Sequence, residues 1–262
     1  MTPDHRQTCG RGLGWLCRQG LLNRAILLMS LFWALMVFVD APVYAFSQQL
    51  DPVLRRIFGW LTNLGDSLWP ILASLILLPL IYVLERRRTG HDRTVVQYMR
   101  GVVTFVFASV VVSGVAVSLV KNAIGRGRPN NPDITGILDF SPFAFQAPWA
   151  SFPSGHSTTA MALATALAIV FPRQAVAFLC LGVWAAISRA MLGVHWTSDI
   201  VAAAVLGTLT VLWLRRVFAR KGIVFVGSGR QRPVLTPRLR RRFGRILRDE
   251  AARVARFGRK RA

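Results

Sequence analysis

Six apolar segments run along the chain, each separated from the next by polar or charged residues. They are residues 25–39, 69–84, 101–120, 157–171, 175–187 and 200–214. A helix needs about 20 apolar residues to cross a hydrocarbon core of about 30 Å. The last three segments are short by this measure, so their polar ends must reach the membrane surface or pack against neighbouring helices. The pattern predicts an all-α, polytopic membrane protein with about six transmembrane helices.

The first apolar segment has an alternative interpretation, because a basic stretch precedes it as in a secretory signal peptide. No convincing small-residue cleavage pattern follows, and apolar residues resume at 42–46. We therefore interpret the segment as a first span. Between Pro129 and Phe152 the chain is rich in prolines and aromatics. That stretch is too polar and too broken to span, and we expect it to form a loop.

Composition agrees with a membrane protein and indicates its orientation. The 262 residues are 53% hydrophobic and carry a net charge of +22. A soluble nucleic-acid-binding protein would explain the charge but not the apolar fraction. Cytoplasmic segments of membrane proteins carry an excess of Lys and Arg. If the N-terminus is cytoplasmic, 27 of the 33 Lys and Arg residues lie inside, and six lie outside: Arg55, Arg56, Lys121, Arg126, Arg128 and Arg189. We therefore expect both termini to be cytoplasmic.

This topology divides the chain into a basic tail (residues 1–24), a membrane domain (residues 25–214) and an arginine-rich tail (residues 215–262). In the last part, apolar residues recur at near-helical spacing between Leu239 and Phe257. That spacing favours an amphipathic helix on anionic lipid headgroups. A disordered, solvated basic tail is the alternative. No nucleic-acid recognition motif is present, so we expect no nucleic-acid partner.

Three polar clusters stand at the edges of the apolar segments. They read KNAIGRGRP (residues 121–129), PSGH (residues 153–156) and SRAMLGVHWTSD (residues 188–199). A charged residue inside a membrane is costly and usually functional. The predicted topology places all three clusters at the outer face, which indicates one site.

The clusters supply what hydrolysis of a phosphate ester without a metal requires. Lys121, Arg128 and Arg189 are cations that can hold phosphoryl oxygens, and the two arginines can do so bidentately. Ser154 and Gly155 lie at the expected start of a helix, where backbone N–H groups and the helix dipole favour an anion.

Two histidines complete the candidate chemistry. His195 and Asp199 are four residues apart, so they share a face if the last helix begins near His195. A carboxylate on one imidazole nitrogen fixes the tautomer and leaves the other nitrogen free to attack. His156 then remains as the acid. We expect no metal, because the cations would repel a divalent ion, and the three cysteines contain no CxxC pair.

Each of these residues also has an ordinary interpretation. His156 alone would be a cap, Lys121 and Arg128 would be interfacial anchors, and His195 with Asp199 would be an interfacial pair. Their joint occurrence on one predicted face favours the site.

The clusters also carry a family resemblance. They match K-x6-RP, PSGH and SR-x5-H-x3-D without a departure, and so the chain resembles the type 2 phosphatidic acid phosphatase family over its second half. Residues 61–69, LTNLGDSLW, are similar to a segment found in bacterial members. The resemblance implies a metal-independent phosphatase with a phosphohistidine intermediate and no cofactor. It implies that His195 attacks phosphorus, Asp199 orients it and His156 protonates the leaving oxygen. The phosphoryl group would be bound by Lys121, Arg128, Ser154, Gly155 and Arg189.

The expected substrate is a lipid phosphate or pyrophosphate at the outer face of a bacterial cytoplasmic (inner) membrane. The candidates are undecaprenyl pyrophosphate, phosphatidic acid, phosphatidylglycerol phosphate and lipid A 1-phosphate. The aromatic loop between Phe140 and Trp149, together with the segment LTNLGDSLW, favours the last of them. Three alternatives stay open: a phosphotransferase with the same site, a soluble vanadium haloperoxidase of the same superfamily, and a non-enzymatic scaffold. The sequence makes no prediction about oligomeric state.

Overall fold

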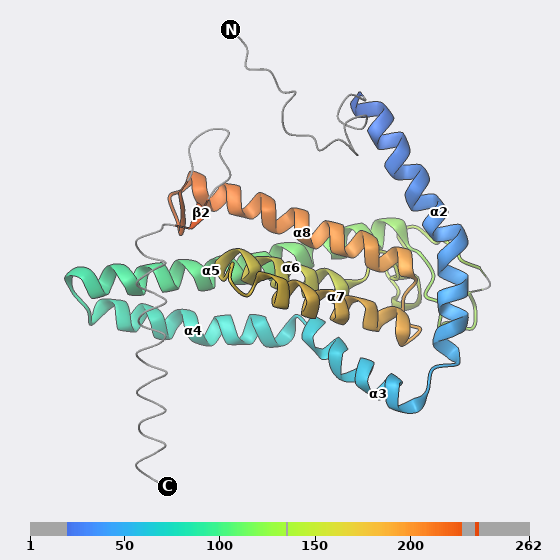
Figure 1. Ribbon diagram of the computed structural model, residues 1–262, viewed down its shortest axis with the longest axis horizontal. Coiled ribbons are helices and arrows are strands. Elements are labelled where there is room, and N and C mark those ends of the chain that lie inside the picture. The colour runs from blue at the N-terminus through green and yellow to red at the C-terminus, as the bar shows by residue number, and fades with distance from the viewer. Residues whose placement is uncertain (1–19, 135, 227–233, 236–262) are drawn as a thin grey trace.

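The computed structural model describes residues 20–134, 136–226 and 234–235, which form an elongated helical bundle (Figure 1). The elements, in chain order, are α2 (Leu21–Gln48), α3 (Pro52–Leu61), η1 (Thr62–Gly65), α4 (Leu68–Arg86), α5 (Gly90–Ile124), η2 (Ala147–Trp149), α6 (Gly155–Val170), α7 (Ala175–Met191), α8 (Thr197–Arg220), β1 (Phe225–Val226) and β2 (Val234–Leu235). The two strands pair antiparallel over two residues each. The predicted helical class is confirmed, with this small hairpin added.

Each predicted apolar segment lies in its own helix, namely α2, α4, α5, α6, α7 or α8. In the described part of the chain, four helical stretches are long and apolar enough to cross a membrane: Leu22–Gln48, Pro52–Arg86, Asp92–Ile124 and Thr197–Arg220. Helices α6 and α7 are shorter, at 16 and 17 residues. The loop expected after Pro129 contains only the short 3-10 helix η2. The amphipathic helix predicted near the C-terminus lies outside the described residues.

The sequence analysis missed α3, which lies between the first two spans. Asp51 caps this helix by accepting a hydrogen bond from the Val53 N–H at 2.7 Å, and Pro52 occupies its first turn. The apolar residues Leu54 and Ile57 are exposed, and none of its residues is buried. A ten-residue helix is too short to register as a span, because span detection depends on length.

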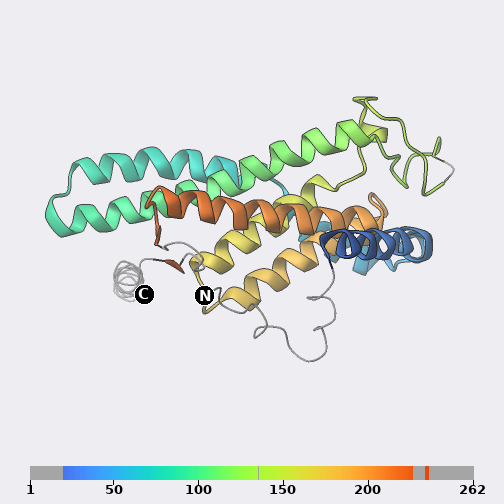
Figure 2. The same ribbon diagram turned by 90° about the horizontal axis from the view of Figure 1, so that it is seen from above.

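Helix α6 lies at the centre and packs against α5, α7 and α8, as Figures 1 and 2 show. Its sequence is rich in Ser, Thr and Ala, and most of these side chains are buried. Two glycines on its neighbours allow the close approach. A Cβ on Gly182 of α7 would lie 2.5 Å from the Ala164 Cβ, and one on Gly207 of α8 would lie 2.6 Å from the Thr158 carbonyl oxygen. Small residues that let helix backbones meet are typical of membrane bundles.

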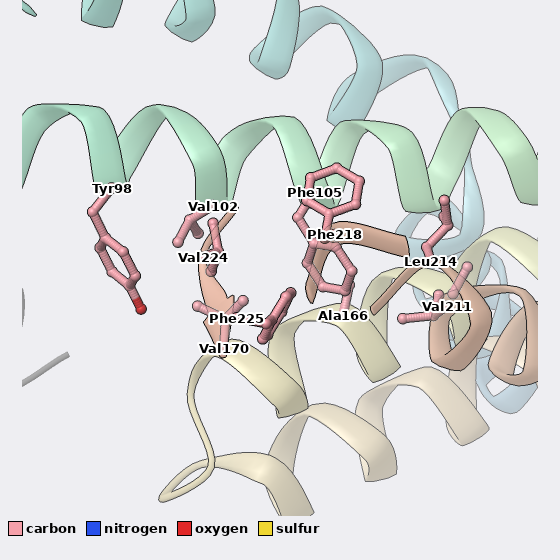
Figure 3. Packing of buried hydrophobic residues seen from close by; sticks show 11 residues of the cluster. Tyr98, Val102, Phe105, Ala166, Val170, Val211, Leu214, Phe218, Val224 and Phe225 are labelled. Atoms are coloured by element: carbon pink, nitrogen blue, oxygen red, sulfur yellow. The ribbon is translucent and has the colours of Figure 1, made fainter. Parts of the chain in front are cut away.

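An aromatic core packs the middle of α5 against the C-terminal end of α8 and the β1 strand that follows it (Figure 3). The Phe105 ring lies 5.3 Å from that of Phe218 and 4.9 Å from that of Phe225, both edge-on. Phe225 is fully buried although it follows α8 by several residues. The described core therefore extends beyond residue 214, where the sequence analysis placed the boundary of the membrane domain.

Helix α2 occupies the edge of the bundle and leans away from it at its N-terminal end (Figure 1). Its helix neighbours are α7 and α8. Most of its described side chains are exposed or half-buried, and the buried ones are Met36, Asp40 and Ser47. An apolar helix in this position is typical of one that faces lipid.

Candidate active site

The structure brings the eight predicted site residues together at one end of the bundle. A Cβ on Gly155 would lie 3.6 Å from the Lys121 Nζ. The Ser154 N–H donates to the Asp199 carbonyl oxygen at 3.3 Å. Lys121 interacts electrostatically with Arg128 and Arg189, and His156 interacts with all three of these cations. His195 and Asp199 form a close pair. Their catalytic roles stay predictions.

Ser154 is the N-cap of α6, as the PSGH motif predicted. Its hydroxyl accepts hydrogen bonds from the Ser157 N–H at 3.4 Å and from the Ser157 hydroxyl at 2.9 Å. The first N–H groups of a helix have no partner within the helix, and the dipole makes this end positive. The α6 N-terminus therefore presents an anion-binding surface beside Lys121.

The two site arginines have hydrogen-bond donors to spare. The buried Nε atoms of Arg128 and Arg189 have no hydrogen-bond partner among the described residues. Other donors of the same guanidinium groups hold the side chains in place. The Arg128 Nη2 donates to the Ala150 carbonyl oxygen at 3.4 Å, and the Arg189 Nη1 donates to the Thr62 hydroxyl at 3.2 Å. Burial lowers the pKa of Arg128, and Asp199 acts in the opposite direction. Each of these Nε atoms is therefore a buried donor that can bind an oxygen of an anion.

His195 precedes α8 instead of lying on it, so it does not share a helix face with Asp199. The two meet because Asp199, in the first turn of α8, folds back toward the chain before the helix. Its Oδ2 accepts a hydrogen bond from the Trp196 N–H at 3.0 Å and lies 3.6 Å from the His195 Nδ1. The predicted pairing is present, but it is a contact between a loop and a helix terminus.

The environment of His195 keeps its imidazole neutral. Burial lowers its pKa from the ordinary value of 6.5 to about 4. Asp199 opposes this shift, whereas Arg128 and Arg189 add to it. Since Nδ1 faces Asp199 and the Ser151 hydroxyl, the proton belongs on Nδ1 and the lone pair on Nε2. At neutral pH His195 therefore offers a nucleophilic nitrogen.

His156 lies in the first turn of α6, opposite the segment that contains η1. A Cβ on Gly65 would lie 2.7 Å from the His156 carbonyl oxygen, so the two backbones are in close contact. Asp66 interacts electrostatically with His156, and Thr62 accepts a hydrogen bond from Arg189. The segment noted only for its resemblance to bacterial relatives thus forms one side of the site.

Three site residues were missed by the sequence analysis. The buried Ser151 donates a hydrogen bond to the Asp199 Oδ2 at 2.5 Å, and its oxygen lies 3.4 Å from the His195 Nδ1. Arg126 donates to the Asp199 Oδ1 at 2.7 Å and also pairs with Asp40 at 2.8 Å. Asp40 could have been recognised, because an acidic residue inside a span-length apolar run is a functional candidate by default.

The donor set of this site is cationic rather than metal-ligating. Across residues 20–134, 136–226 and 234–235, no group of three or more His, Cys, Asp or Glu side chains could hold a metal ion. The cysteine on α7, Cys180, is exposed and free. What the arrangement can bind is an anion with several oxygens.

Comparison with known proteins agrees with the motifs. The profile described as PAP2 superfamily matches residues 102–223. A lipid A 1-phosphatase of Rhizobium johnstonii is 38% identical over 209 residues, which cover 78% of this chain and 80% of that protein. The lipid A 1-phosphatase of Rhizobium etli is 36% identical, over 72% of this chain and 82% of that protein. The crystal structure of Aquifex aeolicus LpxE aligns with a TM-score of 0.43 at 18% identity, over 68% of this chain and 95% of that one. On its sequence match and on the identity and coverage of its relatives, this chain belongs to the PAP2 superfamily.

Proposed function

We propose that this protein hydrolyses a membrane lipid phosphate through a phosphohistidine intermediate, without a metal or cofactor, and that the substrate is the 1-phosphate of lipid A. The observation that carries the proposal is a neutral histidine that faces a carboxylate and lies among three cations, two of which have a buried donor without a partner in the described structure. The names of the two relatives that are more than one-third identical support lipid A as the substrate.

In the first step, the His195 Nε2 attacks phosphorus while the bond from phosphorus to the lipid oxygen breaks. His156 transfers a proton to that oxygen, so the lipid leaves as an alcohol and the phosphoryl group stays on His195. Asp199 stabilises the positive charge that develops on the imidazole. Lys121, Arg128 and Arg189, together with the α6 N-terminus, hold the phosphoryl oxygens.

In the second step, water attacks the phosphohistidine. His156, now deprotonated, takes a proton from the water, and the bond between phosphorus and Nε2 breaks. Inorganic phosphate leaves, and both histidines return to their starting states. Ser154 supports this cycle indirectly, because it caps the helix that carries His156.

The distribution of charge supports an orientation for the reaction. Both termini lie in the cytoplasm under the positive-inside rule, and the site faces the outer side of the membrane. The aromatic loop before α6 exposes Phe143 and Phe145, and these rings are suited to contact the lipid tails. The arginine-rich tail binds anionic headgroups on the inner side.

Phosphate release from purified protein tests the function. The panel contains lipid A, phosphatidic acid, phosphatidylglycerol phosphate and undecaprenyl pyrophosphate, with EDTA throughout. Wild type should release phosphate fastest from lipid A, and His195→Ala should lower turnover on the order of 10⁴-fold or more. Retained turnover in His195→Ala removes it as nucleophile, and loss of wild-type turnover in EDTA contradicts the metal-free mechanism. Transfer of the phosphoryl group to an added lipid alcohol, without phosphate release, would identify a phosphotransferase.

A further inference from the structure

A carboxylate on the outermost helix reaches the centre of the site. Asp40 lies on α2, yet it is 1% exposed. Its Oδ1 accepts a hydrogen bond from the Ser198 N–H at 2.8 Å. Its Oδ2 accepts from the Ser198 hydroxyl at 2.6 Å and from the Arg126 Nη2 at 2.8 Å. Both hydrogen-bonding partners of this carboxylate thus lie within two residues of a predicted site residue in the sequence.

Arg126 connects Asp40 to Asp199. Its side chain is fully buried, with Nη2 on Asp40 and Nη1 on the Asp199 Oδ1 at 2.7 Å. The Ile137 carbonyl oxygen accepts from Nε at 3.1 Å and from Nη2 at 2.8 Å. The guanidinium also lies 5.4 Å from the centre of the Trp196 ring. These contacts fix the planar Arg126 guanidinium in one orientation.

The arrangement leaves the two oxygens of Asp199 with different partners. Oδ1 is bound by Arg126, whereas Oδ2 is bound by Ser151 and the Trp196 N–H and faces His195. Arg126 therefore fixes which oxygen is turned to the imidazole. Two carboxylates share one guanidinium, so Asp199 is not fully neutralised by its partner.

Stability alone does not account for this chain of charges. Burying an ion pair costs desolvation energy that can exceed the attraction between the charges, and apolar side chains of similar volume often replace such pairs without loss of stability. A peripheral helix that packs on α7 and α8 needs no acid to do so. The charges have a use at the site.

We propose that Asp40 and Arg126 are positioning residues for His195, acting through Asp199. Arg126 turns the Asp199 carboxylate, and Asp40 draws part of the Arg126 charge away from it. Asp199 then stays negative enough to stabilise the imidazolium that forms as His195 attacks. The proposal rests on the proposed function, since it needs His195 as the nucleophile.

Two changes to the pair test the proposal. Asp40→Asn keeps the shape and removes the charge. The double variant Asp40→Leu with Arg126→Met removes both charges, so neither of the two is left facing the other's empty place, although the Ser198 N–H and the Asp199 Oδ1 each lose a partner. Both should lower kcat about 10- to 100-fold, by analogy with the loss when a residue that orients a metal ligand by a hydrogen bond is removed, with KM within about threefold.

Glu85→Gln is the matched control. Glu85 is also a buried carboxylate, 5% exposed and 3.0 Å from Arg100, but it lies where α4 ends and α5 begins, at the opposite end of the bundle (Figure 1). Its removal should leave kcat unchanged. Thermal unfolding of all variants in the same detergent separates stability from activity.

Inhibition by vanadate and by inorganic phosphate distinguishes a positioning role from a merely structural one. Vanadate adopts the five-coordinate geometry of the attacked phosphorus, whereas phosphate resembles only the bound product. Both pair variants should weaken inhibition by vanadate about tenfold or more and change inhibition by phosphate less than threefold. Equal shifts for the two anions, or a kcat within twofold of wild type in the folded double variant, overturn the proposal.

Failure of the proposed function and failure of this inference can be told apart. Wild-type protein that releases phosphate from no lipid overturns the proposed function and this inference with it. Active wild type with unaffected variants overturns the inference alone.

Discussion

The backbone contact between Gly65 and His156 fixes the position of His156, the proposed acid. Gly65 ends η1, and the position of its missing Cβ is only 2.7 Å from the His156 carbonyl oxygen. Neither partner is a flexible side-chain end, so a methyl group there must displace one backbone from the other. The acid would then move relative to the bound phosphate.

We expect Gly65→Ala to lower kcat about 10- to 100-fold, because a displacement near 1 Å at a reacting group costs on the order of 10²-fold. Steady-state phosphate release measures it. Gly59→Ala on α3 is the control, since a Cβ there has nothing within 4 Å. Equal rates for the two variants would show that the contact does not position His156.

The predicted site residues were accessible from sequence for a physical reason. Charged groups at the edges of apolar segments are costly, so Lys121, Arg128 and Arg189 stand out without a structure. Ser151 does not stand out, because a serine in a loop is ordinary. Arg126 was counted among the outer cations, but only the fold shows that it turns inward to Asp199.

At the scale of elements, the packing of α6 decides whether the site can assemble, because α6 carries Ser154 and His156 at its N-terminus. Its axis runs close to α8, where a Cβ on Gly207 would lie 2.6 Å from the Thr158 carbonyl oxygen. An added methyl group at this crossing would push apart the two helices that carry His156 and Asp199.

Gly207→Ala should therefore destabilise the protein by about 1–3 kcal/mol through overpacking. Gly114→Ala on α5 should instead stabilise it by about 0.5–1 kcal/mol, because alanine favours a helix more than glycine does and a Cβ there meets nothing within 4 Å. Unfolding in a detergent titration gives both values. Two changes of the same sign would contradict the close crossing.

The positions of the long helices could be predicted from hydropathy, whereas the helix ends and the short helix α3 could not. The six apolar segments each became a helix, since lipid requires the backbone to bond within itself. The start of α8 at Thr197 excludes His195 from the helix, because Asp199 turns back to bind the Trp196 N–H. No periodicity in the sequence reports such a cap. The ten-residue α3 carries too short a pattern to compete with the spans on either side.

At the scale of the whole molecule, the two ends of the bundle have different chemistry. One end gathers the buried charges of the site, and the aromatic cluster of Phe105, Phe218 and Phe225 lies away from it, where α8 ends (Figure 3). Protonation at the charged end is linked to unfolding of the whole chain, because the pKa of His195 differs between the folded and unfolded states.

The sign of this linkage follows from the lowered pKa. The pKa of His195 is 6.5 in the unfolded chain and is lowered by burial to about 4 in the folded one. Between these values the unfolded chain binds more protons, so stability should fall as the pH drops from about 6.5 to 4. Melting temperatures in detergent at pH 7.5 and pH 5 measure this. His195→Gln should show a smaller difference between the two, and an undiminished difference would assign the pH dependence to other groups.

Burial of Asp40 also has a consequence for how the protein is made. Its partners Arg126 and Ser198 follow it by 86 and 158 residues. At about 5–20 residues per second, roughly 8–30 s pass between synthesis of the acid and synthesis of Ser198. Arg126 is made after roughly 4–17 s at the same rate, and until then α2 holds a carboxylate without its ion-pair partner, at a cost of roughly 2.5–3.5 kcal/mol if it is ionised at the bilayer centre. Among the described helices, α2 thus completes its contacts only after the start of α8 has been synthesised, so the burial of one carboxylate sets the order in which these helices assemble.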